Sequence, residues 1–158
     1  MYNKSSVSVG FIYTSDEIFD ATSLMSTYMT KDIKTKEGQS LFEELSLSPD
    51  ERNIFEENFK TIRSQLYELL QTHLGSELIS LAYTTTLNIV IKANSNYTDN
   101  NLILINEGLK ETIIEGCLSE WFKTCGYEPL YKLSAEKYLL LGVQLRNRLF
   151  LLKKKRAI

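Results

Sequence analysis

A chain of 158 residues is long enough to bury one hydrophobic core and short for two, so we expect a single domain over residues 1–158. Its hydrophobic fraction of 43% and charged fraction of 24% are ordinary for a globular protein and exclude wholesale disorder. No apolar run approaches the ~20 residues that span a bilayer, and the first residues lack the apolar core of a signal peptide. The sequence therefore predicts a protein without a membrane partner, made and kept in a cytosol.

The small net charge of −2 hides a strong polarity. Residues 137–158 hold seven of the 18 Lys and Arg residues and none of the 20 acidic ones, so this end carries +7 and the remaining 136 residues carry −9. A protein polarised in this way can meet a copy of itself, or an anionic partner, with opposite charges facing.

The N-terminal third predicts a short extended segment, a helix and a loop. Residues 5–13 alternate apolar and small polar positions, which indicates either a strand or an extended N-terminal arm over 1–13. Thr14 and Glu17 have the spacing of a capping box, and Ile18, Met25 and Met29 follow at helical spacing. We therefore expect a helix over about 15–31, followed by a polar loop over 32–40.

The strongest helix signal begins at Ser48. This serine is placed to cap, Pro49 occupies the first helical position, and two acidic residues follow at the positive end of the helix dipole. Gly75 supplies a stop, so the helix covers 49–74. Its apolar stripe is Phe55, Phe59, Ile62, Leu66, Leu69 and His73.

Residues 86–93 are rich in β-branched side chains and predict a strand with Leu87, Ile89 and Ile91 on one side. Residues 78–83 are a candidate pairing strand. Because a lone hairpin is marginal in water, it must pack on helices or join a strand of another subunit. The second alternative makes Leu87, Ile89 and Ile91 candidate interaction residues.

Two long helices complete the chain, over about 98–124 and about 134–153, with Gly126 and Pro129 between them. The last helix carries leucines on every side, so it lies either at the centre of the core or half buried in a neighbouring subunit. The predicted fold is mainly α: a bundle of about four helices with a small β-hairpin or strand insertion. The stripe of the first of these helices is Leu102, Ile105, Leu109, Ile113, Cys117 and Trp121.

The sequence offers little chemistry. His73 is the only histidine, and we interpret it as structural. Cys117 and Cys125 are two helical turns apart, roughly 12 Å, which is beyond disulfide reach, so both are expected to be reduced thiols. No CxxC, HxxxH or glycine-rich phosphate loop is present. We predict no catalytic, cofactor or metal site, and no enzymatic activity.

Two features remain as interaction candidates. The basic segment, ending in a tail over about 153–158, is open to three readings: a solvated tail, a contact for an acidic protein surface, or a contact for nucleic-acid phosphate. Trp121 and Phe122 are either core residues or an intersubunit anchor. The basic candidates are Arg146, Arg148, Lys153, Lys154, Lys155 and Arg156.

The order of these landmarks resembles small neck proteins of tailed phages, particularly crAss-like and related gut phages, over roughly residues 11–156. The resemblance rests on Asp16-Glu17 opening the first helix, Asp50-Glu51-Arg52 opening the next, Glu120-Trp121-Phe122 before the last, and Arg146 with a basic finish. The lysines followed by Ala157 and Ile158 at the end depart from the Pro-rich or Arg-rich tails common in that family.

The resemblance implies a non-enzymatic virion protein, a head–tail connector made in the host cytoplasm. Such proteins form homo-oligomeric rings, commonly dodecamers, beneath the portal protein, where they extend the DNA channel close to the genome and dock other neck or tail proteins. The alternative is a small helical DNA-associated regulator or packaging factor that uses the basic C-terminus on phosphates.

Overall fold

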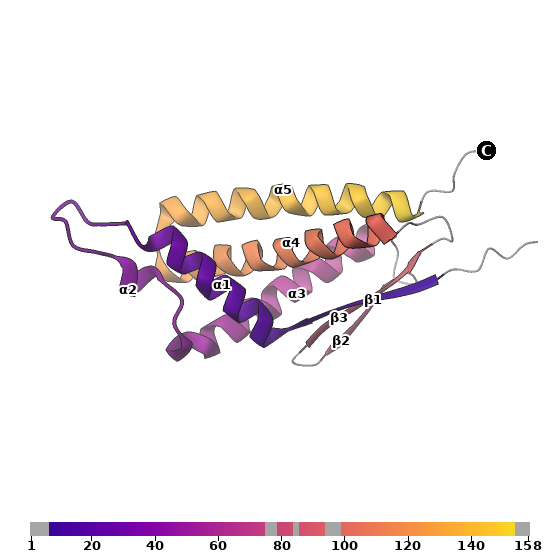
Figure 1. Cartoon of the computed structure of the whole chain (residues 1–158), viewed down its shortest axis with the longest axis horizontal. Helices are drawn as coiled ribbons and strands as arrows, with labels where there is room; N and C mark the ends of the chain where they lie inside the picture. Colours follow the sequence, from indigo (N-terminus) through magenta and orange to yellow (C-terminus); the bar gives the residue numbers. More distant parts are fainter. Residues whose placement is uncertain (1–6, 75–78, 84–85, 94–98, 154–158) are drawn as a thin grey trace, which may run out of the picture.

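The computed structural model describes residues 7–74, 79–83, 86–93 and 99–153 (Figure 1). Four long helices and a small antiparallel sheet make up this part of the chain, which confirms the predicted mainly α class. The elements, in order, are β1 (Val7–Thr14), α1 (Ser15–Thr30), α2 (Phe42–Leu45), a 3-10 turn (Pro49–Glu51), α3 (Arg52–Leu74), β2 (Ile79–Tyr83), β3 (Thr86–Ala93), α4 (Asp99–Cys125) and α5 (Glu128–Lys153).

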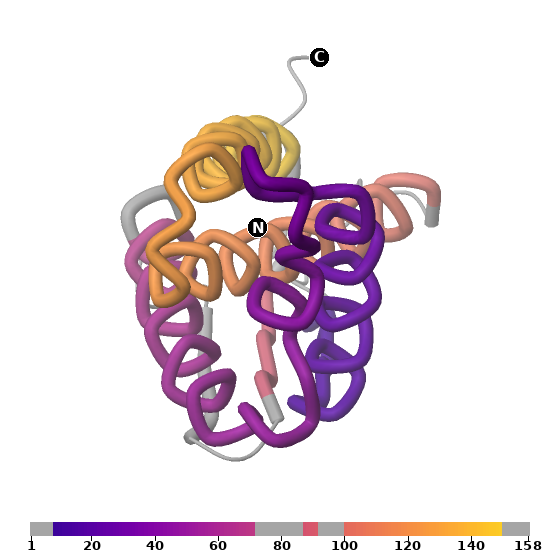
Figure 2. The backbone as a smooth tube through the Cα atoms, turned by 90° about the vertical axis from the view of Figure 1, so that its left-hand side faces the viewer, coloured from indigo at the N-terminus to yellow at the C-terminus, as the bar shows by residue number. Residues whose placement is uncertain are grey.

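Helix α4 is the centre of the bundle. Seen along the long axis, α3 and α1 flank it on opposite sides and α5 lies across its top (Figure 2). Contacts with the three other long helices explain why its sequence is apolar beyond a single stripe. Its buried apolar residues are Ile105, Leu109, Ile113, Cys117, Leu118, Trp121 and Phe122.

The sheet has the strand order β1-β3-β2, with both pairings antiparallel. Leu87, Ile89 and Ile91 alternate along β3 and are fully buried beneath the helices, while Val90 between them points to the outer face and is 37% exposed. The period of two therefore separates a core face from a surface face. Tyr13 of β1 ties the sheet to α4, because its hydroxyl donates to Asn106 Oδ1 at 2.6 Å.

The N-terminal segment is a strand for most of its length. Residues 7–14 pair with 86–93 along β3, so the prediction of an arm over 1–13 is wrong for residues 7–13, and residues 1–6 lie outside the described residues. Helix α1 begins where predicted, since the Thr14 hydroxyl accepts a hydrogen bond from the Glu17 backbone N–H at 3.1 Å.

The predicted residues Ile18, Met25 and Met29 do face the core, and small hydroxyl residues, which were not predicted, share the inner face of α1 with them. Thr22 and Thr30 are fully buried, and each hydroxyl donates to the carbonyl four residues earlier, at 2.7 and 2.6 Å. Ser26 is also fully buried and accepts a hydrogen bond from the Leu47 backbone N–H at 2.8 Å. Such satisfied hydroxyls let the helix approach its neighbours closely without leaving unpaired polar atoms.

Helix α3 confirms the prediction for 49–74, with its first residues in the 3-10 turn. Ser48 precedes the turn as expected, but its hydroxyl donates to the Glu51 carboxylate at 2.7 Å and caps no backbone N–H. The stripe is buried at Phe55, Phe59, Ile62 and Leu66; the predicted Leu69 is partly buried against the core, and Leu70, which was not predicted, is fully buried. The side chain of His73 and the stop at Gly75 lie outside the described residues.

Helix α5 starts six residues earlier than predicted. Gly126 ends α4 with a φ of 73°, and Pro129 then lies in the first turn of α5. Proline is tolerated there because the first helical N–H groups have no intrahelical acceptor. Pro129 therefore opens the last helix, and α4 and α5 form a tight antiparallel hairpin (Figure 1).

Candidate interaction surface

The predicted interaction residues of β3 lie in the core of their own chain. Leu87, Ile89 and Ile91 are each 0% exposed, and β3 is hydrogen-bonded along both edges, to β1 and to β2. A central strand has no free edge to offer, so the idea that it pairs with a neighbouring subunit is wrong. The second pairing partner of β3, besides β2, is β1, which lies about 80 positions earlier in the same chain.

Trp121 and Phe122 are also core residues, exposed by 3% and 0%. The indole Nε1–H of Trp121 donates to the Leu45 carbonyl at 2.7 Å, which fixes the short helix α2 against α4. Of the two alternatives for this pair, core packing is therefore the one that the structure supports.

Some cations of the basic segment 137–158 make contacts within the chain, and others are exposed. Arg148 donates to the Leu104 carbonyl of α4 at 3.0 Å, and Lys137 forms an ion pair at 3.0 Å with Glu115, whose side chain is 6% exposed. Arg146 is exposed on α5. The side chain of Lys153 and residues 154–158, with Lys154, Lys155 and Arg156, lie outside the described residues.

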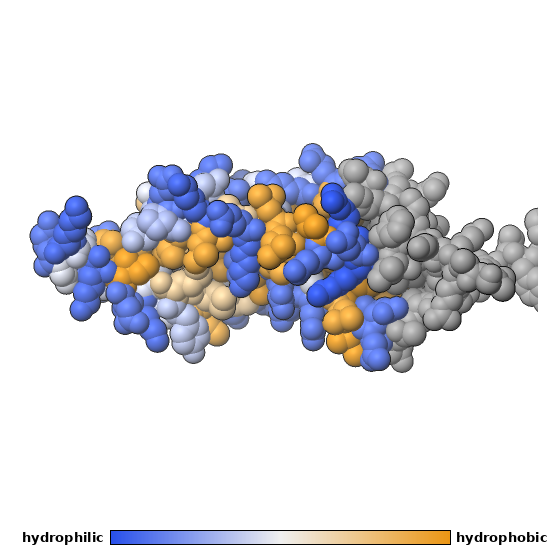
Figure 3. All heavy atoms as spheres, turned by 90° about the horizontal axis from the view of Figure 1, so that it is seen from above, coloured by the Kyte–Doolittle hydropathy of each residue, from blue (hydrophilic) through white to orange (hydrophobic). Residues whose placement is uncertain are grey.

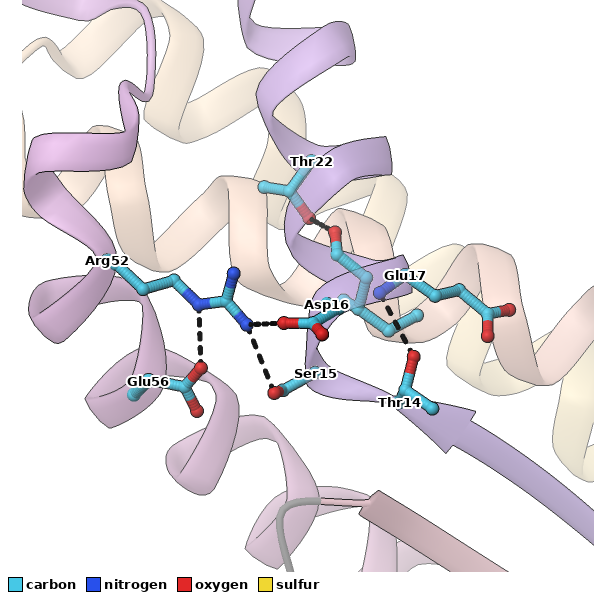
Figure 4. Close-up of polar contacts among 8 residues, drawn as sticks. Thr14, Ser15, Asp16, Glu17, Thr22, Arg52 and Glu56 are labelled. Carbon is cyan, nitrogen blue, oxygen red and sulfur yellow. Dashed lines mark hydrogen bonds and ion pairs between the residues drawn. The ribbon is translucent and has the colours of Figure 1, made fainter.

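Two landmarks of the family resemblance meet in an ion-pair cluster. Figure 4 shows Arg52 reaching from the start of α3 toward the first turn of α1, where its Nη2 lies 2.6 Å from Asp16 Oδ1 and 3.2 Å from the Ser15 hydroxyl. Its Nε donates to Glu56 at 2.8 Å, and the guanidinium lies 4.6 Å from the Phe19 ring centroid. Burial lowers the pKa of Arg52, but the hydrogen bonds to Glu56 and Asp16 outweigh it and leave the pKa raised.

This cluster fastens α1 to α3 and offers no acid–base chemistry. A guanidinium with a raised pKa keeps its proton at every physiological pH, so it cannot exchange one with a substrate. Its charge is shared by two carboxylates and its planar face covers an aromatic ring, which is the usual arrangement of a structural arginine.

The two cysteines are free thiols, as predicted. Cys117 is buried, and this burial raises its pKa far above the usual range. Cys125 is half-buried; burial, with a contribution from Glu51, raises its pKa from 9.0 to about 11. Because the thiolate is the nucleophile and the metal ligand, both side chains are in their unreactive form near neutral pH.

Within the described ranges, no group of three or more His, Cys, Asp and Glu side chains is arranged to hold a metal ion. Nor does any helix in that part of the chain combine the length and apolar character needed to cross a membrane.

The feature that stands out on the surface is the outer face of α5, which the view from above displays as apolar side chains among hydrophilic ones (Figure 3). Leu139 is 69% exposed, Leu140 57% and Val143 44%, and the exposed Glu136 and Arg146 flank them. We call these five residues the α5 strip. Leu133, 56% exposed, lies one turn before it.

A second exposed strip runs along α1 and was missed in the sequence. Leu24 is 57% exposed and Tyr28 61%, and the exposed Asp20 and Lys31 lie before and after them. We call these four residues the α1 strip. Their spacing of four, four and three residues places them on one helix face, while Ile18, Met25 and Met29 form the more apolar stripe on the inner side of the helix.

A comparison of the chain with protein-family models, curated proteins and solved structures finds no match. Its function must therefore be argued from its own residues.

Proposed function

We propose that this chain is a structural subunit that assembles with copies of itself into a ring at the head–tail junction of a tailed phage, below the portal. The observation that carries the proposal is the α5 strip. The helix packs one side on α4 and leaves the three large apolar side chains of this strip, and Leu133 before them, in water. Burying a Leu or Val side chain is worth about 1.5–3 kcal/mol, so a neighbour covering this strip would gain a substantial driving force.

The charge distribution supports assembly through two different surfaces. Asp20 is exposed in the second turn of α1, after Asp16 and Glu17, which pair with Arg52 and Lys110, while Arg146 is exposed toward the end of α5. A ring requires each subunit to present two unlike, complementary patches, and patches of opposite charge meet this requirement while opposing wrong contacts between like ones.

Several polar side chains of the described chain hold its elements together. Arg52, Tyr13 and Trp121 each join two elements through buried or half-buried hydrogen bonds. The two thiols are held in the protonated form. This use of polar groups supports a structural role.

The alternative, a DNA-associated regulator, draws less support from the described residues. Phosphate binding needs several free cations on one surface. Lys137 is paired with Glu115, and Arg148 donates to a backbone carbonyl. Among the cationic side chains described in residues 137–149, Arg146 is the one without such a contact inside the chain. We therefore do not advance this function.

The test is the mass of the particle formed. We expect the purified chain, alone at high concentration or mixed with the portal protein of its phage, to form a closed ring of defined copy number, measured by native mass spectrometry and electron microscopy. A variant truncated after Leu152 should keep its helical circular dichroism while assembly weakens.

Two results would overturn the proposal: a chain that stays monomeric both alone and with portal, or steep salt-dependent binding of a monomer to duplex DNA. Unchanged assembly of the truncated variant would instead show that the basic tail is a solvated end.

A further inference from the structure

We infer that the α5 strip of one copy packs antiparallel on the α1 strip of the next copy. This inference rests on the proposed function, since it names the two unlike surfaces by which ring neighbours would meet. Both strips are exposed in the isolated chain, and each has an apolar centre between two charged residues.

The two strips match in length, sequence order and charge. Asp20 and Lys31 are 11 positions apart, and Glu136 and Arg146 are 10 positions apart, so both spans cover about 15–17 Å of helix. In the antiparallel register Leu24 lies opposite Val143, and Tyr28 opposite Leu139. The same register places Asp20 beside Arg146 and Lys31 opposite Glu136, an ion pair at each end of the apolar centre.

If one of the two helices ran in the opposite direction, the opposite charges would no longer face each other. In a parallel register that still pairs Leu24 with Leu139 and Tyr28 with Val143, Lys31 would face Arg146, and like charges across an interface are unfavourable. The antiparallel sense also suits a ring. Within one subunit α1 and α5 already run in opposite directions along the long axis (Figure 1), so neighbours with their long axes side by side retain that sense.

The placement of the strips allows one contact to be repeated around a ring. Helices α1 and α5 lie on different sides of α4 (Figure 2), so a subunit can offer its α5 strip to one neighbour and its α1 strip to another. Contacts between two unlike surfaces are the kind that continue from copy to copy until the ring closes.

A symmetric contact between two α5 helices is the main competitor. Glu136 could face Arg146 and Leu139 could face Val143 of a second copy, each pair occurring twice. That arrangement stops at two copies and leaves Leu24 and Tyr28 in water, whereas the contact of α5 on α1 covers both strips at once. We therefore favour the latter, and the experiment separates the two.

The test is disulfide cross-linking between copies, in a background carrying Cys125→Ser so that the buried Cys117 is the only native thiol. The double variant Leu24→Cys with Val143→Cys should give, on mild oxidation of the assembled protein, a ladder of dimers, trimers and higher multimers. Each single variant should give no ladder. The matched control is Leu24→Cys with Leu133→Cys, because position 133 is exposed but lies about 15 Å from position 143 along the helix.

Charge reversal tests the register independently. Asp20→Arg alone, or Arg146→Asp alone, should weaken subunit association roughly tenfold, and the two changes in one chain should restore it to within about threefold. Helical circular dichroism checks that each variant is folded. Both residues are exposed, so neither change removes a core contact.

Each outcome decides something different. Efficient dimer formation by Val143→Cys alone would overturn the inference in favour of the symmetric α5 contact. A protein that forms rings but shows neither the ladder nor the charge rescue overturns the inference and leaves the proposed function standing. A chain that remains monomeric with and without portal overturns both.

Discussion

Gly116 of α4 lies against side chains of both α3 and α5, and replacing it with alanine tests this packing directly. A Cβ at position 116 would lie 2.8 Å from Ile62 Cδ1 and 2.9 Å from Tyr138 Cε1. Carbon atoms pack best at about 3.5–4.0 Å, so the new methyl group would overlap two side chains that the core holds in place. Gly142 of α5 is the matched control, because its nearest neighbour would be Leu69 Cδ2 at 3.8 Å, an ordinary contact.

The comparison isolates the packing term. Both glycines are in helix interiors, so Gly→Ala gains about 1 kcal/mol of helix propensity at each position. At position 116 the overlap costs about 1–3 kcal/mol as well. We therefore expect Gly142→Ala to be more stable than wild type by about 1 kcal/mol, and Gly116→Ala to be less stable than Gly142→Ala by about 1–3 kcal/mol.

The assay is urea unfolding followed by helical circular dichroism, at a protein concentration where sedimentation shows one species, because association would add its own free energy. Adding Ile62→Val removes the Cδ1 methyl group that the new Cβ at position 116 would overlap. That change alone should cost about 0.5–1.5 kcal/mol, and clearly less in the Gly116→Ala background. Equal stability of Gly116→Ala and Gly142→Ala would refute the close approach of the three helices.

Three further predictions concern the polar contacts. Arg52→Met should lower the free energy of unfolding by about 1 kcal/mol in urea titrations, less in high salt, because Asp16 loses a partly exposed partner. Trp121→Phe should lower it by about 1–3 kcal/mol, since the Leu45 carbonyl loses a buried donor, and Trp121→His, which can still donate from its ring, should recover part of the loss. The rate of alkylation of Cys125 at pH 8 should be lower than that of a small thiol, and this rate should increase with pH until about pH 11. The raised pKa also stabilises the folded state: the contribution is fully present below pH 9 and is lost as the pH rises through 11. An ordinary thiol titration near pH 9 would contradict the last prediction.

The helices were predictable where an apolar stripe coincides with a start or stop signal. Helix α3 has both, in Pro49 and the spacing from Phe55 to Leu66, and it lies where expected. The boundary between α4 and α5 was misjudged because proline both ends helices and occupies their first turn, and the local sequence around Pro129 does not separate the two roles.

The strands β2 and β3 were predicted from local patterns, but the pairing of β1 with β3 and the hydroxyl residues on the inner face of α1 were not. The pairing of β1 with β3 joins residues about 80 positions apart, and nothing within either segment names its partner. Thr22, Ser26 and Thr30 are polar by type, so a search for apolar periodicity passes over them although they are fully buried. Their hydroxyls are satisfied by nearby backbone carbonyls, and such local bonds become evident only once the helix is built.

The candidate interface illustrates a further limit of the sequence. Helices α4 and α5 are both apolar on nearly every side, so either could have been the central one. The structure places α4 at the centre, where its polar Thr112 and Glu115 are buried but paired, with the Gly108 carbonyl and with Lys137. Lys137 of α5 forms an ion pair with Glu115, which is the buried carboxylate among the described side chains of α4, and the Lys137 side chain itself stays about half exposed. Leu145 and Leu149 of α5 are fully buried in the core, and the same orientation of the helix leaves Leu139, Leu140 and Val143 exposed on its outward side.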